Sequence, residues 1–254
     1  MILVGLTGGI GAGKSTVSSL LATRGAVIVD ADAITRDVQR PGQPVLAAIA
    51  DRYGVGVLTA AGELDRAALA GIVFNDPDAL KDLNALVHPA VNLEIARRVL
   101  AERSSGCVLV LDIPLLLDSD RTRHLAAVVV VDCPVDVAVD RLVRFRHMDA
   151  DDARARISRQ VSREDRRAKA HRVLDNAGEP DALVPQIDAL WAWLRTLPAA
   201  TDEDLAPMAK AVADAAKAVA DAAKAAADAA KAAADAANGT VDAAVAADGA
   251  VDAT

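Results

Sequence analysis

The sequence has few cysteines, no long apolar run and no excess of basic residues, and each absence narrows the class of protein. Cys107 and Cys133 are the two cysteines, and both sit in or beside strongly apolar, strand-like runs. Such thiols are typical of small buried side chains in a reducing compartment rather than of metal ligands or a disulfide. No stretch of ~18 or more residues has transmembrane character, and no basic leader precedes a cleavable apolar segment. We therefore expect a cytoplasmic protein that does not cross a membrane.

The formal net charge of −8 is unevenly distributed along the 254 residues. Residues 202–254 hold ten acidic residues and four lysines, which leaves 24 basic and 26 acidic residues in 1–201. A nearly neutral main part does not indicate a nucleic-acid-binding surface. The length allows one large domain or two small ones.

A glycine-rich motif follows the first predicted strand. Residues 2–6 are apolar, and the run Gly8–Ser15 fits GxxxxGK[ST] at every defined position. Glycines let the backbone approach a polyphosphate, Lys14 would neutralise the β- and γ-phosphates, and the Ser15 hydroxyl would hold Mg2+. A chance glycine-rich turn is the alternative, and the strand-to-helix context argues against it. The expected nucleotide contacts are Gly9, Ile10, Gly11, Ala12, Gly13, Lys14, Ser15 and Thr16.

Two aspartates follow the second predicted strand, residues 26–29. Because helical segments separate the predicted strands, we expect a parallel sheet whose ligands gather at the C-terminal ends of its strands. A carboxylate there can accept the proton of an attacking hydroxyl or order the Mg2+ shell, or it can cap the helix expected from Ala33. We assign capping to Asp30 and the functional role to Asp32.

Residues 41–104 show no strand signal, and amphipathic segments at about 45–52, 65–74 and 77–101 predict a helical insertion. Asp65 and Asp76 before Pro77 are suitable helix starts. His88-Pro89 lies inside the longest segment, where Pro89 should bend the helix. A single histidine such as His88 is more often structural than catalytic.

The other three predicted strands are residues 108–111, 126–132 and 173–176. Asp112 ends the first of them, where a carboxylate would organise Mg2+, with a cap or turn aspartate as the alternative. Arginines then crowd the stretch from Arg141 to Arg167, which is typical of a lid over phosphates or of a solvated helix with many ion pairs. An amphipathic helix over residues 181–195 closes this part of the chain.

The sequence contains several short motifs in a specific order and spacing. They are residues 4–16, Asp30-Ala31-Asp32, Ala67-Ala68-Leu69 through Ile72-Val73-Phe74, His88-Pro89, Asp112-Ile113-Pro114-Leu115-Leu116, Arg141-Leu142 with Arg144, and Asp175-Asn176. In these motifs residues 1 to about 196 resemble the dephospho-CoA kinases, which make the last step of coenzyme A synthesis. Two stretches depart from the family pattern, Arg144-Phe145-Arg146-His147-Met148 and Ala170-His171-Arg172-Val173.

The resemblance implies a fold and a set of roles. The fold is α/β, a three-layer phosphate-loop core with a parallel five-stranded sheet, a helical CoA domain and a lid. The substrates are ATP, with Mg2+, and dephospho-CoA. The resemblance assigns catalytic roles to Asp32, as the base, and to Lys14 and Arg141. It adds Arg144 and Asn176 to the ATP contacts, with Asn176 near the adenine. The acceptor would contact Asp32, His88, Asp112 and Leu115, and the metal would contact Ser15 and Asp112.

We accordingly divide the chain into a kinase domain, residues 1–200, and a tail, residues 201–254. The core comprises residues 1–40, 105–140 and 171–200, the acceptor domain about 41–104 and the lid about 141–170. From Lys210 the tail repeats every seven residues in Ala, Lys and Asp, which predicts a helix, and beyond Asn238-Gly239 we expect disorder. The tail is a dispensable solvated appendage or an arm for an unknown partner, and a monomer is favoured.

Two other functions remain open from the sequence. A nucleoside or nucleotide kinase on the same core would prefer a small acceptor over dephospho-CoA. A nucleotide-dependent switch or adaptor would hydrolyse slowly whatever the acceptor, and would lose partner capture without residues 202–254.

Overall fold

The structure is a computed structural model that describes residues 1–114, 116–118 and 120–219. The chain divides into two compact units, Met1–Ala209 and Lys210–Thr254. Of the second unit, residues 210–219 are described, and they are helical.

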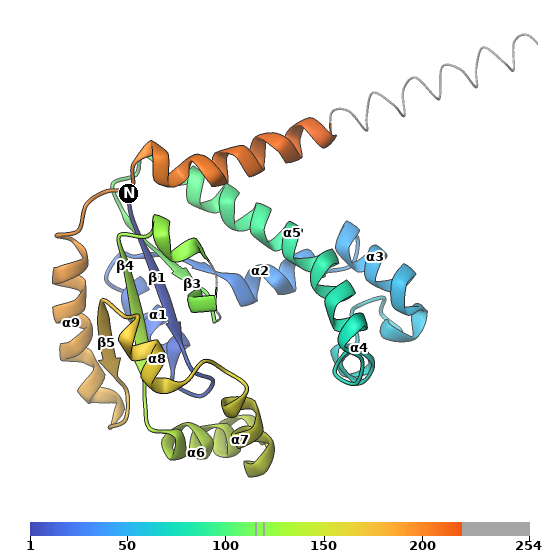
Figure 1. The fold of residues 1–254 in the computed structure, drawn as a ribbon, viewed down its shortest axis with the longest axis horizontal. Coiled ribbons are helices and arrows are strands. Elements are labelled where there is room, and N and C mark those ends of the chain that lie inside the picture. Colours follow the sequence, from blue (N-terminus) through green and yellow to red (C-terminus); the bar gives the residue numbers. More distant parts are fainter. Residues whose placement is uncertain (115, 119, 220–254) are drawn as a thin grey trace, which may run out of the picture. The chain divides into compact units, whose positions relative to one another are not determined.

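The first unit is built on a sheet of parallel strands (Figure 1). In the described residues the sheet has five strands in the order β2-β3-β1-β4-β5. The strands are β1 (Ile2–Gly8), β2 (Val27–Asp30), β3 (Val108–Asp112), β4 (Ala127–Asp132) and β5 (Arg172–Asp175). The parallel five-stranded sheet expected from the sequence is confirmed, and β1 continues two residues farther than predicted, into the glycine run.

Side chains of the central strands alternate between the two faces of the sheet, as the twofold period of a strand requires. Val4 and Leu6 of β1 lie in the core on one face, whereas Leu3 lies in the core on the other. The strands are apolar on both faces because helices cover both, which is the usual condition of a parallel sheet.

Four helices cover the two faces. On one face, α1 (Lys14–Ala22) and α9 (Leu183–Leu194) bury Val17 and Ile187 against the strands. On the other, α2 (Ala31–Val38) and α5 (Pro77–Ala101) bury Ile34 and Val99. The result is the three-layer α/β architecture predicted from the sequence.

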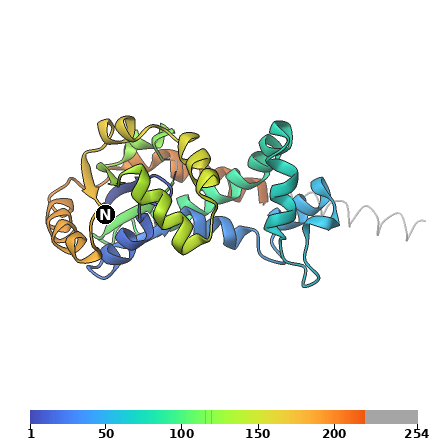
Figure 2. The ribbon, with the colours of Figure 1, turned by 90° about the horizontal axis from the view of Figure 1, so that it is seen from below.

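A run of helices separates β2 from β3, and Figure 2 shows it extending to one side of the sheet. It consists of α3 (Pro44–Tyr53), the 3-10 turn η1 (Val55–Val57), α4 (Arg66–Val73) and α5. As predicted, Asp65 and Asp76 cap α4 and α5, each accepting hydrogen bonds from two backbone amides. Pro77 occupies the first turn of α5, and Pro89 lies within that helix.

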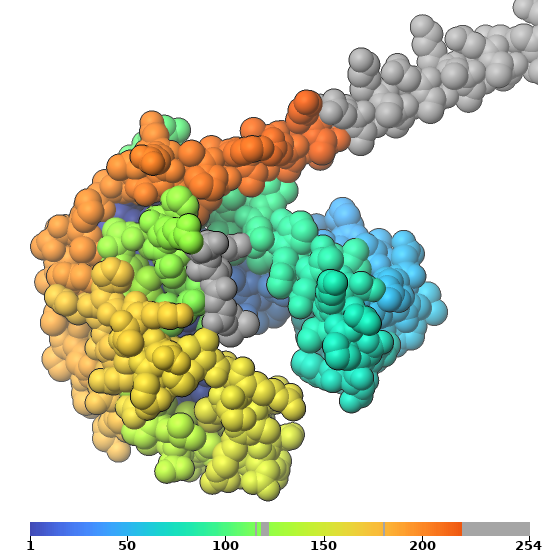
Figure 3. All heavy atoms as spheres, in the orientation of Figure 1, coloured from blue at the N-terminus to red at the C-terminus, as the bar shows by residue number. Residues whose placement is uncertain are grey.

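Three shorter helices occupy the arginine-rich stretch between β4 and β5. They are α6 (Val135–Arg146), α7 (Ala150–Ser158) and α8 (Arg163–Ala168). The 3-10 turns η2 (Leu116–Asp118) and η3 (Asp120–His124) follow β3, and η4 (Pro180–Ala182) precedes α9. Figure 3 shows an opening on this face of the molecule between α7 and the helices α4 and α5.

Residues 202–219 form a helix whose first part belongs to the first unit. Leu205 is 3% exposed and packs with Met208 on the core that contains α5. The amide of Ala200 also donates to the carbonyl oxygen of Met1 at 2.9 Å. Farther along, Lys210 and Asp214 form an exposed ion pair of 2.5 Å, four residues apart. The rest of the repeat and the disorder expected beyond Asn238 lie outside the described residues.

No helix in the described part of the chain is long and apolar enough to cross a membrane. Both cysteines are free, Cys133 buried and Cys107 partly buried.

Candidate active site

Aspartates end four strands at one edge of the sheet. They are Asp30 of β2, Asp112 of β3, Asp132 of β4 and Asp175 of β5. Strand register pairs Asp30 with Asp112 and Asp132 with Asp175, so these residues lie at matching levels. The central strand β1 ends instead in the glycine loop. Ligands bind at this edge in open α/β sheets, and each carboxylate here has a different set of partners.

The glycine loop, residues 8–13, joins β1 to α1 and has little room for side chains. Gly11 and Gly13 have φ values of +78° and +89°, which favour glycine. A Cβ atom at Gly11 would lie 2.7 Å from the carbonyl oxygen of Ala138, and one at Gly13 would lie 2.2 Å from Nδ2 of Asn176. The loop is therefore held against α6 and the segment after β5, and backbone amides at the start of α1 remain available to an anion.

Asp112 joins the loop lysine to the sheet. The carboxylate is nearly buried, its Oδ1 accepts from Nζ of Lys14, and its Oδ2 accepts from the Ser18 hydroxyl at 2.5 Å. Lys14 and Ser18 lie one turn apart on α1, so one helix face presents both donors. Ser18 was not predicted as a site residue from the sequence, although its position four residues after Lys14 places both on one face of a helix.

Asp30 and Asp32 take different positions at the start of α2. The Asp30 side chain accepts from the amides of Asp32 and Ala33 at 2.8 and 3.0 Å, which makes it the N-cap, as expected. Asp32 lies in the first helical turn and is exposed. Within the described residues we find no hydrogen bond or ion pair to its carboxylate. Asp32 thus remains open to a ligand at the same edge as Lys14.

The segment between α7 and α8, together with α8 itself, touches the glycine loop. Oε1 of Gln160 accepts from the amide of Ile10 at 3.0 Å. The Arg166 guanidinium lies beside Gly9, since a Cβ there would be 2.8 Å from Nη2. Gln160 and Arg166 border two adjoining pockets. One is also lined by Thr7, Gly8, Pro114, Leu117 and Val161, and the other by Gly9, Ile10, Ala12, Val131, Asp132, Cys133, Val135, Ala138, Ile157 and Arg163.

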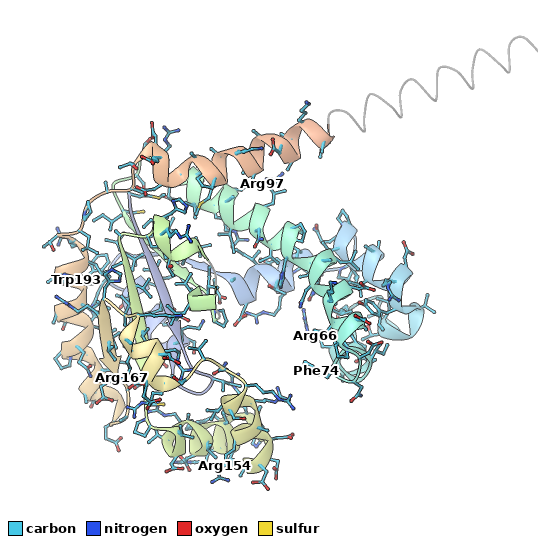
Figure 4. All side chains as sticks on the ribbon, in the orientation of Figure 1. Arg66, Phe74, Arg97, Arg154, Arg167 and Trp193 are labelled. Carbon is cyan, nitrogen blue, oxygen red and sulfur yellow. The ribbon has the colours of Figure 1, made fainter. Side chains whose placement is uncertain are left out.

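Asp132 binds two arginines of α8. Its side chain is 2% exposed, and it accepts from Nε of Arg163 at 2.9 Å, Nη2 of Arg163 at 2.8 Å and Nη1 of Arg167 at 2.6 Å. Arg167 is labelled in Figure 4, on α8 beside β4. Burial raises the pKa of Asp132, but the hydrogen bonds from the two arginines outweigh it and the pKa is lowered. The carboxylate therefore stays ionised, and sequence reasoning did not single it out.

The predicted lid contacts Arg141 and Arg144 lie in different surroundings. Nη1 of Arg141 is buried without a hydrogen-bond partner in the described structure and lies 3.9 Å from the Cβ position of Gly13. Arg144 is exposed, pairs with Asp140 at 3.3 Å and stacks over Phe145. The structure thus brings Arg141, and not Arg144, next to the glycine loop.

Asn176 lies beneath the loop. Its Nδ2 donates to the carbonyl oxygen of Ala12 at 2.8 Å, its backbone amide donates to the carbonyl oxygen of Asp132, and the residue is 7% exposed. It therefore connects β5 to the loop.

Burial raises the pKa of the neighbouring Cys133 thiol, which keeps that side chain protonated and apolar in character.

The remaining predicted residues are less constrained by the structure. His88 is exposed on α5, beside Pro89. Ser15 and Thr16 are exposed in the first turn of α1, where the Ser15 hydroxyl is open to a ligand. Leu115 lies outside the described residues. No cluster of three or more carboxylate, histidine or cysteine side chains that could hold a metal occurs in the described portion of the chain.

A glycine loop at the end of a central parallel strand, with its lysine, an aspartate on the adjacent strand and arginines beside it, defines a phosphate-loop kinase. Residues 2–181 match the family model described as dephospho-CoA kinase. The chain belongs to the dephospho-CoA kinase family.

Two curated relatives match over nearly their whole lengths. The chain is 45% identical over 195 residues to the dephospho-CoA kinase of Thermobifida fusca, covering 77% of this chain and 97% of the relative. It is 46% identical over 195 residues to that of Corynebacterium jeikeium, covering 76% and 100%. The matched part therefore corresponds to a full-length relative, and about a quarter of this chain has no counterpart there.

Solved structures agree. A Thermus thermophilus protein superposes with a TM-score of 0.63 at 34% identity, over 76% of this chain and 97% of that one. A dephospho-CoA kinase from Campylobacter jejuni superposes with a TM-score of 0.55 at 22% identity, over 75% and 96%, which shows the shared fold.

Proposed function

We propose that this protein transfers the γ-phosphate of ATP to the ribose 3′-hydroxyl of dephospho-CoA, giving coenzyme A and ADP, the last step of coenzyme A biosynthesis. Family membership supports the reaction, and the complete glycine loop with Lys14 held by Asp112 is the observation that carries it. The chain is a kinase in this reading, and its tail takes no part in the chemistry.

The described residues suit such a transfer. Loop amides and Lys14 would bind the phosphates, and the unpartnered Nη1 of Arg141 would donate to the nucleotide beside Gly13. Phosphate oxygens would compete with Asp112 for Lys14. Phosphoryl transfer depends mostly on positioning and on stabilising the charge that develops in the transition state, which these cationic donors provide.

Asp32 would accept or orient the proton of the 3′-hydroxyl. It is exposed at the edge of the sheet, and Asp30 fixes the first turn of α2 on which it stands. A base in this role must reach the hydroxyl proton, and an exposed, unpaired carboxylate leaves that approach open.

The donor set fits Mg2+, which favours oxygen ligands and in kinases binds through one or two protein groups together with substrate phosphates. The Ser15 hydroxyl and the Asp112 carboxylate are the groups that would hold it. When bound, the ion would neutralise charge on the phosphate oxygens. Each Asp112 oxygen accepts one hydrogen bond, from Lys14 or from Ser18, and keeps a second lone pair with which it could hold the ion.

We propose the division of labour that the sequence suggested, with a core, an acceptor domain of residues 41–104 and a lid of residues 141–170. His88 and Leu115 would line the acceptor site, and Asn176 and Arg144 would lie on the nucleotide side. A cytoplasmic location and a monomeric enzyme complete the proposal.

The test is an assay of the purified full chain with Mg2+·ATP and a panel of acceptors that includes nucleosides, nucleotides and dephospho-CoA. ADP release is measured, and the position of the new phosphate is found by mass spectrometry and NMR. We expect phosphate on the 3′-oxygen of dephospho-CoA, and at least a 100-fold lower kcat for Asp32→Asn, the general-base contribution. A folded, ATP-binding protein that no acceptor stimulates would exclude the kinase activity.

A further inference from the structure

One stretch of the lid, residues 160–167, contacts both the glycine loop and the end of β4. Its first residue, Gln160, accepts from the Ile10 amide, and Arg166 lies over Gly9. Arg163 and Arg167 bind Asp132. Asp132 and the four side chains of this stretch were not among the individual site residues expected from the sequence.

The two ends of the glycine loop have different neighbours. Asn176 and Arg141 lie beside Gly13, at the start of α1. Arg166 lies beside Gly9, at the opposite end, and borders the pocket that also reaches Pro114, just beyond Asp112. In loops of this type the amides cradle the α- and β-phosphates, and the lysine reaches the β- and γ-phosphates. Lys14 is held by Asp112, two residues before the Pro114 that lines the pocket at Arg166, so Arg166 lies on the side of the loop where the terminal phosphate would bind.

Asp132 fixes the helix that carries Arg166. Arg163 and Arg167 are one helical turn apart, so a single carboxylate that binds both fixes the rotation of α8 about its axis. Arg166 lies on the same helix, three residues from Arg163; its Nη1 donates to the carbonyl oxygen of Val161, and its Nη2 lies beside Gly9. Asp132 is buried at the end of β4, whereas the two arginines are partly exposed. The carboxylate in the sheet is therefore the fixed partner of this contact.

We propose that Arg166 is the lid side chain that contacts the terminal phosphate of ATP, and that Asp132 is a positioning residue that holds it there through Arg163 and Arg167. The inference rests on the proposed kinase function. A guanidinium at this point stabilises the charge that develops during transfer. Gln160, which accepts from the Ile10 amide, holds the same segment against the loop.

The experiment compares Arg166→Ala, Asp132→Asn and the double variant in the full chain. Binding of ATP and of ADP is measured by calorimetry, and kcat and KM for ATP are measured with dephospho-CoA. We expect Arg166→Ala to lower kcat at least 100-fold and to weaken ATP binding more than ADP binding. Arg154→Ala is the matched control, because Arg154 is an exposed arginine on α7 that forms an ion pair with exposed Asp151 at 3.6 Å (Figure 4). It should leave all four values unchanged.

The double variant separates positioning from a general structural effect. Asp132→Asn should lower kcat at least tenfold alone and less than twofold in the Arg166→Ala background, because its effect passes through Arg166. An equal factor in both backgrounds would overturn the positioning role. If Asp132→Asn does not fold, Arg163→Lys replaces it, since it keeps the charge but loses the fork that binds Asp132.

An Arg166→Ala protein with unchanged kcat and an unchanged ratio of ATP to ADP affinity would overturn the phosphate contact. That result is distinguishable from failure of the proposed function. Wild-type turnover of dephospho-CoA tests the kinase reaction, whereas the affinity ratio for the two nucleotides needs no acceptor.

Discussion

Replacing Gly11 by alanine tests whether the loop must pass as close to α6 as the structure places it. The new Cβ would lie 2.7 Å from the carbonyl oxygen of Ala138, whereas ordinary contact begins at 3.4 Å. One of the two backbones must therefore move by about 0.7 Å, because a carbonyl group cannot rotate away as a side chain can. The left-handed φ of +78° adds a cost of its own.

The expected effect has two parts. Left-handed backbone costs an alanine about 1–2 kcal/mol, and overpacking costs about 1–3 kcal/mol, so Gly11→Ala should lower the free energy of unfolding by about 2–5 kcal/mol. A displacement approaching 1 Å at the reacting centre costs roughly 100-fold in rate, and we expect a loss of kcat on that order.

Gly25→Ala is the matched control. Gly25 has a φ of +98°, and a Cβ there would meet nothing within 4 Å. It should cost about 1–2 kcal/mol of stability and leave kcat and ATP affinity unchanged. Urea unfolding gives the two stabilities, and calorimetry with steady-state kinetics gives the function. Equal stability and equal ATP binding for Gly11→Ala and Gly25→Ala would refute the packing argument.

Two further predictions concern stability. The lowered pKa of Asp132 means that its ion pairs contribute fully above the unfolded value of about 3.9 and are lost as the pH falls through the folded value. The Tm difference between wild type and Asp132→Asn should therefore be constant from about pH 8 to pH 5 and shrink below about pH 4. Asp151→Asn, at an exposed pair, is the control, and a difference that grows on acidification would contradict the sign. Leu205→Ala should lower the free energy of unfolding by about 2–5 kcal/mol in urea titrations, because Leu205 is buried. A loss of unfolding free energy below about 0.5 kcal/mol would show that residues 202–209 do not pack on the core.

The elements that the sequence predicted best are those determined by nearby residues. Alternating or continuous apolar runs located the strands within one or two residues, and the glycine motif located the loop between β1 and α1. Caps at Asp30, Asp65 and Asp76 followed from carboxylates just before helical periodicity. Each of these depends on contacts across only a few residues, which a sequence displays directly.

Contacts between distant segments could not be predicted in this way. Asp132 and Arg163 are 31 residues apart, and Gln160 and Ile10 are 150 residues apart. An arginine-rich stretch shows that some arginines will face carboxylates, but the rotation of each short helix decides which. That rotation depends on packing against the sheet, and the sequence pattern of α8 is too short and too polar to reveal it.

The two departures from the family pattern have local structural counterparts. His147 ends α6 with a φ of +51°, the only left-handed residue other than glycine in the described chain, within the first of these stretches. His171 accepts a hydrogen bond at Nδ1 from the amide of Val128 at 3.1 Å, at the entry to β5.

Helix α5 is long enough to act as a lever between the sheet and the helices α3 and α4. At about 1.5 Å of rise per residue its 25 residues span roughly 37 Å. Its C-terminal half packs on the sheet, while its N-terminal half contacts α3 and α4. By simple geometry, a tilt of about 5° at the sheet would displace the far end by about 3 Å, the size of a hydrogen bond. Pro89 lies midway along α5 and removes one backbone hydrogen bond. The helix should therefore bend most easily at this residue.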